Sequence, residues 1–478
     1  MPSRRSRTAA GWWSSCRDDH PGMRVAALTA AVAATALLPG EPLGVGVVLV
    51  ALLVAAAVGA AVERVTVDLV LFGAAALALA CVPAVRDASW VVALDLTAAW
   101  LLASAAVTGP TIAAVPAPLA RLRGVPALAP PMPVALAPGL RGALLGGLLA
   151  LPFGALFWSA DAAFADLFRG IPLPSWVGLP GHLAAFVLVL LAALGLALAA
   201  RRPLRVRAPR PRRRLGVWEW AIPLVLLDAL FLAFVAVQVT VLFGGRDHVL
   251  RTAGLTYAEY ARQGFWQLLA VGALTLAVVA VADVVADVSR PRDALLVRVL
   301  LGTLCALAIV VVISALHRLR LYEDAFGLTR LRLLAEAFAL WLGGLFGLLI
   351  AAGIVARVLR QLPRAVLVGT AAALLAFSLA NPDGLIAERN VERWRDTGRL
   401  DVAYLQTLSA DAADALAELP PELRSEALAP LAARLARDEP WSSANLSRHR
   451  ARSSIAGVES LWSHRPPGRR SQHGIPVL

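Results

Sequence analysis

Apolar residues of this chain occur in long blocks, separated by short segments that hold most of the arginines and prolines. The blocks are about 15 to 28 residues long, and a helix needs about 20 apolar residues to cross the hydrocarbon core of a bilayer. The pattern therefore predicts an all-α, polytopic membrane protein with about 11 transmembrane helices and a small helical C-terminal tail. The predicted spans are residues 25–38, 44–62, 65–84, 90–107, 140–158, 182–200, 217–243, 265–285, 295–316, 335–356 and 365–380.

Composition supports this fold class. Hydrophobic residues make up 59% of the chain, charged residues 16%, and the mean hydropathy is +0.71. The net charge of +13 would suggest nucleic-acid binding in a soluble chain, but the arginines lie between the apolar blocks. Membrane topology and anionic lipid headgroups account for them better, so we expect a bilayer partner and no nucleic acid.

The polar segments divide the chain into six parts. Residues 1–24 form a basic leader, 25–109 hold spans one to four, and 110–139 form a proline-rich cytoplasmic linker. Residues 140–380 hold the remaining spans, 381–441 form the helical tail, and 442–478 are predicted to be disordered because Ser, Arg, His and Pro dominate there. Residues 25–38 are short for a span, so they fit either a retained first helix, which we favour, or a signal-peptide core. Met23 is a second plausible start.

Arginine placement predicts the orientation. If each block crosses the membrane and the N-terminus is cytoplasmic, the inner segments hold 23 arginines and the outer loops 9. The positive-inside rule then predicts an extracytoplasmic C-terminus. We expect this multi-pass protein in the plasma membrane. The segment Arg201 to Arg214 holds eight of the inner arginines. It is interpreted as an orientation signal, or as a site for anionic lipid headgroups.

Asp228 lies near the middle of the 217–243 block, where an ionisable side chain is unfavourable unless it has a partner or water. Pro223 in the same helix removes a backbone donor. Asp228 therefore indicates either a proton or solute path, or a hydrogen bond that ties two helices together. Gln238, Asp68 and Asp95 raise the same question.

Two polar clusters lie in predicted outer segments. They contain Tyr257, Glu259, Tyr260 and Arg262 in the first segment, and Arg320, Tyr322, Glu323 and Asp324 in the second. Together with Asp228 and Gln238 they form the candidate polar site. The clusters could bind an anionic or glycan-bearing ligand, or they could hold the outer loops together by ion pairs.

Several sequence motifs follow one another in order. They read FVAVQ with FGG at 234–245, LTYAEYARxGF at 255–265, LYExAFGLT at 321–329, and NPD with IAxxNV at 381–391. Through these motifs the chain resembles, over about residues 140 to 450, a family of bacterial polytopic membrane proteins described only as a domain of unknown function. The resemblance implies an architecture and no reaction.

We find no sequence motif for phosphate binding, zinc binding, nucleophilic catalysis or thiol redox chemistry. No catalytic residue, metal ligand or cofactor is therefore predicted. The leading hypothesis is a non-catalytic or transport-type protein of the cell envelope. One alternative is an envelope enzyme that acts on a lipid-linked or glycan substrate through Glu259, Glu323, Asp324 or Asp383. Another is a signalling protein whose tail binds an envelope partner. Oligomeric state does not follow from the sequence.

Overall fold

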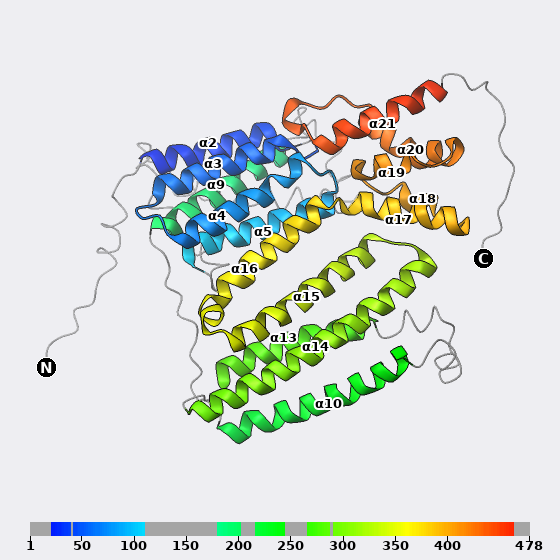
Figure 1. Cartoon of the computed structure of the whole chain (residues 1–478). Coiled ribbons are helices and arrows are strands. Elements are labelled where there is room, and N and C mark those ends of the chain that lie inside the picture. Colours follow the sequence, from blue (N-terminus) through cyan, green and yellow to red (C-terminus); the bar gives the residue numbers. More distant parts are fainter. Residues whose placement is uncertain are drawn as a thin grey trace, which may run out of the picture.

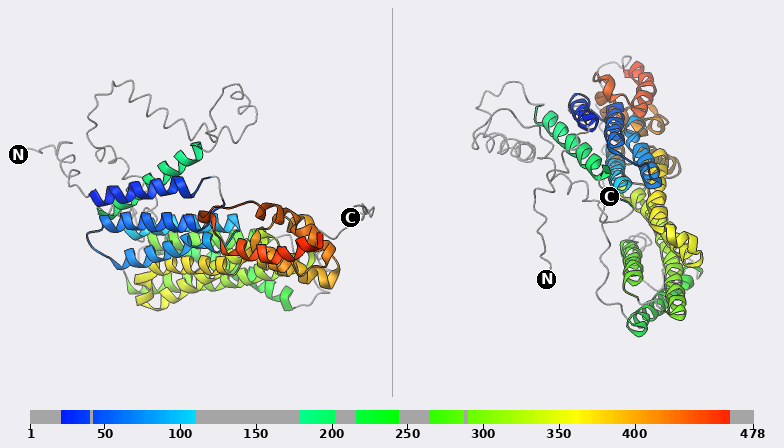
Figure 2. Two further views of the ribbon diagram at one scale, coloured as in Figure 1. Left: turned by 90° about the horizontal axis from the view of Figure 1, so that it is seen from above. Right: turned by 90° about the vertical axis from the view of Figure 1, so that its left-hand side faces the viewer.

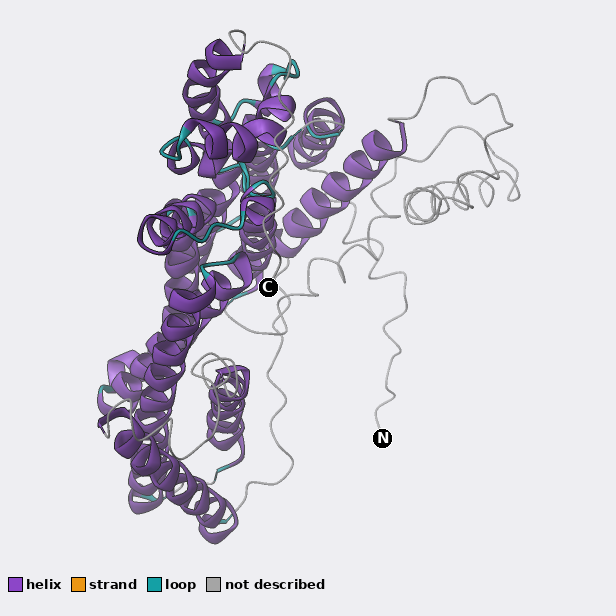
Figure 3. Ribbon diagram, turned by 90° about the vertical axis from the view of Figure 1, so that its right-hand side faces the viewer, coloured by secondary structure: helices purple, strands orange, loops and turns teal. Residues whose placement is uncertain are grey.

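The computed structural model describes residues 21–39, 42–109, 179–201, 216–243, 265–286 and 290–462. Its regular elements in these ranges are all helical (Figure 3). A helix coincides with every predicted span except 140–158, which lies outside these ranges. The helices at the predicted spans, here called the membrane helices, are α2 (Pro21–Leu37), α3 (Val45–Ala61), α4 (Val67–Ala80), α5 (Ser89–Thr108), α9 (Leu179–Arg201), α10 (Val217–Phe243), α13 (Phe265–Val285), α14 (Pro291–Phe326), α15 (Arg330–Ile354) and α16 (Ala356–Leu379).

Seven helices in the described ranges are long and apolar enough to cross a membrane, namely α4, α5, α9, α10, α14, α15 and α16. The apolar parts of α2, α3 and α13 are shorter. Many of the leucines and valines on these helices are exposed, as expected for surfaces that face lipid. The predicted helical membrane protein is confirmed, while the number of about 11 spans stays a prediction.

The membrane helices form two groups, which Figure 1 separates clearly. In the first group, α2, α3, α4, α5 and α9 pack closely through small residues such as Ala27, Ala57 and Ala193, which are fully buried. In the second group, α10, α13, α14 and α15 share a core that contains Leu304 and Phe346. Helix α16 packs against α4 and α5 of the first group and against α15 of the second, so it joins the two groups (Figure 2).

Helix α14 is too long to lie wholly within a bilayer. Its 36 residues extend over about 54 Å at 1.5 Å per residue, whereas the hydrocarbon core is about 30 Å thick. The polar residues from His317 to Asp324 occupy its last turns. This predicted outer segment is therefore a helical extension, which ends where Gly327 takes a φ of 79°.

Residues 381–462 form a helical domain, here called the tail domain, at one end of both groups (Figure 1). Its buried core contains Ile386, Leu405, Leu416 and Leu428. The elements are α17 (Pro382–Thr397), α18 (Val402–Leu405), η4 (Ala410–Ala412), α19 (Ala413–Leu416), α20 (Pro421–Leu435), η5 (Trp441–Ser443) and α21 (Leu446–Trp462).

The prediction of disorder from residue 442 is wrong for residues 442–462. Helix α21 lies in this stretch and buries Ala451 and Ile455 in the core of the tail domain. The polar composition misled the prediction because several of these polar residues, such as Asn445, Ser447 and Arg448, are buried with hydrogen-bond partners. Residues 463–478 lie outside the described ranges.

Candidate functional site

Among the described residues, most of the buried polar side chains lie in the tail domain or where it meets the ends of the membrane helices. We call this region the tail junction, and it joins residues 381–462 to the chain segments 43–46, 83–90 and 324–330. One of these segments belongs to the α14–α15 turn of the second group, and the other two belong to the first group. The junction thus brings three distant parts of the sequence together.

Asp383, in the first turn of α17, is the centre of the junction. Its side chain is 0% exposed, and Arg330 donates to both carboxylate oxygens, from Nε to Oδ1 at 2.9 Å and from Nη2 to Oδ2 at 2.6 Å. Trp90 Nε1 donates to Oδ1 at 3.0 Å and the Ser409 amide to Oδ2 at 2.9 Å. One carboxylate therefore links both helix groups and a second segment of the tail domain.

The charge of Asp383 is stabilised in this position. Burial raises the pKa of this carboxyl, but the hydrogen bonds and charge of Arg330, with the donors Ser409 and Trp90, outweigh burial and hold the pKa below its ordinary value of 3.8. Asp383 is thus an ionised, fully occupied acceptor. It lacks the access to solvent and the free oxygen that a general acid or base needs to reach a substrate.

Asp411, the middle residue of η4, is the second centre of the junction. Its Oδ2 accepts the amides of Asp87 and Ala88, both at 2.7 Å, and the Ser409 hydroxyl at 3.0 Å. Its Oδ1 accepts the Ser447 hydroxyl. These donors favour the carboxylate, but burial has the larger effect and raises the pKa of Asp411 above its ordinary value. Asp411 holds the end of the α4–α5 connection, directly before α5, against the tail domain.

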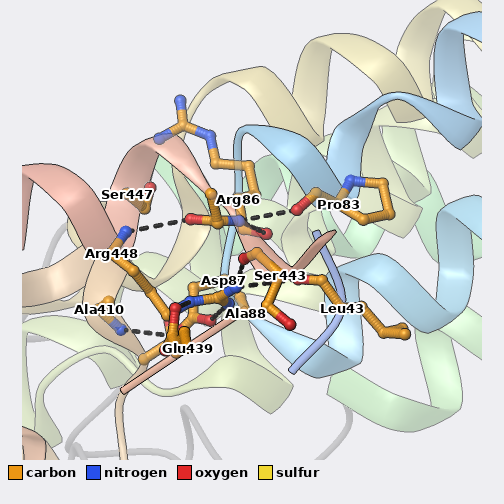
Figure 4. A network of polar contacts seen from close by, with 12 residues as sticks. Leu43, Pro83, Arg86, Asp87, Ala88, Ala410, Glu439, Ser443, Ser447 and Arg448 are labelled. Atoms are coloured by element: carbon orange, nitrogen blue, oxygen red, sulfur yellow. Dashed lines mark hydrogen bonds and ion pairs between the residues drawn. The ribbon is translucent and has the colours of Figure 1, made fainter. Parts of the chain in front are cut away.

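Asp87 and Arg448 complete this side of the junction (Figure 4). Asp87 Oδ2 accepts the Ala410 amide at 3.1 Å, and its Oδ1 accepts Arg448 Nη1 at 2.5 Å. Arg448 is buried and also pairs with Glu439, at 3.1 Å from Nε to Oε2. The two acids neutralise the guanidinium, which explains how an arginine can be buried there.

The α14–α15 turn, residues 327–329, is bound by α17 and α18. Asn390 Nδ2 donates to the Leu328 carbonyl at 2.8 Å, and the Tyr404 hydroxyl accepts the Arg330 amide at 2.7 Å. Arg393 Nη2 donates to the Ala325 carbonyl at 2.7 Å. A Cβ on Gly327 would collide with Asn390 Oδ1, so this turn requires glycine both for its positive φ and for the close approach of α17.

The predicted second cluster lies beside this turn. Arg332 stacks on the Tyr322 ring, with its Cζ 4.2 Å from the ring centroid, and the Asp324 carbonyl accepts Arg393 Nε at 3.1 Å. Glu323 Oε1 is shielded from solvent and has no hydrogen-bond partner in the described ranges. The Asp324 and Arg320 side chains point outward and are exposed. This cluster borders the junction, and only part of it contributes contacts.

The first predicted cluster, with Tyr257, Glu259, Tyr260 and Arg262, lies outside the described residues. Gln238 lies on α10, in a stretch whose side chains are not described. Arg202 to Arg214, most of the predicted lipid-binding segment, also lies outside them. Whether the two clusters meet therefore stays a prediction.

The membrane carboxylates differ in their surroundings. Asp68 forms an ion pair with Arg364 of α16, at 2.6 Å and 3.1 Å, at the end of the bundle opposite the tail domain. Asp95 accepts the Ser378 hydroxyl at 2.9 Å and ties α5 to α16. Asp228 faces the core of the second group, near Cys305, and neither of its shielded oxygens has a partner among the described residues.

The site residues predicted from the sequence do not include Arg330, Trp90, Asp411, Asp87 or Arg448. Asp383 and Asn390 lie in the quoted motif at 381–391, which is the signal that the sequence offers for this site. Asp87 and Arg448 are separated by 361 positions, so no local pattern indicates that they meet. Among the described residues, no group of three His, Cys, Asp or Glu side chains could hold a metal ion.

These features define an all-helical membrane protein whose tail domain is fixed to one end of its helices by buried ion pairs and hydrogen bonds. The chain belongs to the family described as Domain of unknown function (DUF4153), whose model matches residues 72–419. The match begins within α4 and ends after α19, so it includes Asp87, Arg330, Asp383 and Asp411 of the tail junction but not Arg448, and it begins earlier than the expected position near residue 140. No curated protein and no solved structure matches the chain.

Proposed function

We propose that this protein is non-catalytic and that its membrane helices hold the tail domain as a docking surface for a partner in the cell envelope. The observation that carries the proposal is the complete burial of Asp383 between Arg330, Trp90 and Ser409. If the tail domain only had to stay attached to the membrane helices, the covalent connection after α16 would be enough. A network that fixes the orientation of the tail domain is useful when something else must recognise that orientation.

The exposed face of the tail domain offers charged residues for such recognition. Arg395 and Glu418 form a surface ion pair at 2.7 Å, and Glu422 and Glu426 are exposed on α20. Mixed charges of this kind provide specificity and guide the approach of a partner. We infer from the arginine distribution that this face lies outside the cytoplasm.

A second candidate function is a proton or solute path through the second helix group. It is favoured by Asp228, whose two oxygens have no hydrogen-bond partner in the described part of the chain and face an apolar core. An intramembrane carboxylate without a partner is a functional hypothesis in its own right, because such a group is costly to insert. The two functions require different residues, so one set of variants separates them.

The test is complementation of a strain that lacks this protein, with all variants matched for their amount in the membrane. Docking predicts that truncation after Ala380 and the Asp383→Ala variant both fail, whereas Asp228→Asn complements. A transport path predicts that Asp228→Asn fails. Full activity of the truncated chain would contradict docking. A photo-crosslinker placed at Glu426 should then capture one envelope protein in the parent and not in Asp383→Ala.

A further inference from the structure

Residues 441–446, which include η5 and the first residue of α21, pack directly on the start of α3. The Val45 amide donates to the Ala444 carbonyl at 3.0 Å. Gly44 makes this contact possible, because a Cβ there would lie 2.5 Å from the Ser443 carbonyl carbon. The height of this segment relative to the membrane is therefore fixed by the position of α3.

Because α3 coincides with a span predicted from the sequence, its length places that segment at the membrane surface. Its 17 residues extend over about 25 Å, less than the hydrocarbon thickness of about 30 Å. Both ends of α3 must then stay close to the headgroup regions. The residues bound to its first turn cannot lie far above the bilayer.

The side chains of this segment divide into two sets. Ser442, Ser443 and Asn445 are buried against the bundle and fix the backbone. Trp441 is 66% exposed and Leu446 is 41% exposed. Leu43, in the adjacent α2–α3 connection, is 38% exposed. The structure thus directs apolar side chains outward from a backbone that is otherwise held by polar contacts.

The surrounding charges are mainly basic. Arg437, His449 and Arg450 are exposed and lie within four positions of Trp441 or Leu446 in the chain, as does the exposed acid Asp438. Tryptophan favours the headgroup region, and arginines are attracted to an anionic membrane surface. An exposed apolar cluster with arginines beside it is a better match for an anionic lipid surface than for an acidic or an apolar protein surface.

We propose that Trp441, Leu446 and Leu43, together with Arg437 and Arg450, form a bilayer-contact surface that binds anionic headgroups around α2 and α3. This surface rests the tail domain on the leaflet and leaves its distant face free. The inference is independent of the docking function, since lipid contact would serve any role of the tail domain.

The test uses the full chain in nanodiscs, with Cys16, Cys81 and Cys305 replaced and one environment-sensitive dye attached at Trp441→Cys. The matched control carries the dye at Asp396→Cys, an exposed position on the same domain. It lies about 20 Å along α17 from Asn381, on the helix that leads away from α16 (Figure 1). Headgroup-labelled nitroxide lipids serve as quenchers.

We expect quenching at position 441 to exceed quenching at position 396 at least threefold. Phosphatidylglycerol should increase it relative to phosphatidylcholine alone, and the double variant Arg437→Glu with Arg450→Glu should cancel that increase. Equal quenching at both positions would overturn the proposal. A dye at 441 that is shielded in native membranes but unquenched in nanodiscs would indicate a protein occupant, which also overturns it.

Discussion

Removing the carboxylate of Asp383 is expected to loosen the tail domain from the membrane helices. In Asp383→Ala, Arg330 loses two hydrogen bonds, and the Ser409 amide and the Trp90 indole lose their acceptor. The Arg330 side chain is 33% exposed and can be partly rehydrated. The Ser409 amide is buried and cannot.

The magnitude follows from these contacts. An unsatisfied buried N–H costs about 1 to 3 kcal/mol, and breaking a buried ion pair costs about 3 to 5 kcal/mol. Because Arg330 is partly exposed, we take about 3 kcal/mol as the expected loss. Each 1.4 kcal/mol is a factor of ten in an equilibrium constant, so the opening equilibrium of the junction should rise about a hundredfold.

Hydrogen exchange measures this opening directly. The amides of Ser409 and Ala410 are bonded to Asp383 and Asp87, so a peptide that covers residues 406–412 reports on the junction. Its protection should fall about a hundredfold in Asp383→Ala. The control is Arg395→Ala, which removes a surface pair worth about 0 to 1 kcal/mol. A change below about threefold in Asp383→Ala would refute the reasoning that the ion pair holds the junction.

Three further changes test other parts of the junction. Gly327→Ala should separate α17 from the α14–α15 turn and lower the melting temperature of the tail domain in a thermal scan, because the new Cβ collides with Asn390; an unchanged melting temperature would contradict this. Gly44→Ala should release η5 from α3, measured as faster exchange of the Val45 amide, since its Cβ meets the Ser443 backbone at 2.5 Å. The pKa of Asp383 is lowered, so its contribution is complete above pH 3.8 and is lost as the pH falls further. A pH series of exchange rates should show this loss in the parent chain and not in Asp383→Asn.

The sequence was sufficient to predict the helices because lipid imposes a simple rule on them. A block of apolar residues between polar segments has few alternatives to a spanning helix, so α5, α10 and α13 lie close to their expected positions, whereas α14 extends beyond its expected end and α16 begins before its expected start. The same rule gave no information about the packing of these helices. Helix α16 packs on α4 and α15 through apolar residues that resemble those on any other helix.

The junction was harder to predict, for a physical reason. Its contacts join a side chain to a distant backbone group, as when Asn445 donates to the carbonyls of Pro83 and Arg86, and a carbonyl leaves no signature in the sequence. The polar composition of residues 442–462 predicted disorder, although several of their polar side chains, such as Ser442 and Arg448, are buried. Asp383 lies in a sequence motif, but nothing in the sequence distinguishes its partner Arg330 from the other loop arginines.

The position of Asp383 between Trp90 of the first helix group and Arg330 of the second has a mechanical consequence. Any sliding of one group past the other at this end would pull the carboxylate away from one of its partners. We therefore expect the junction to act as a pivot, with the larger relative motion of the two groups at the opposite end. There the Asp68–Arg364 pair, which is partly exposed, holds α4 to α16 more weakly. A molecule built this way is expected to separate its helix groups more easily at the end that lies away from the tail domain.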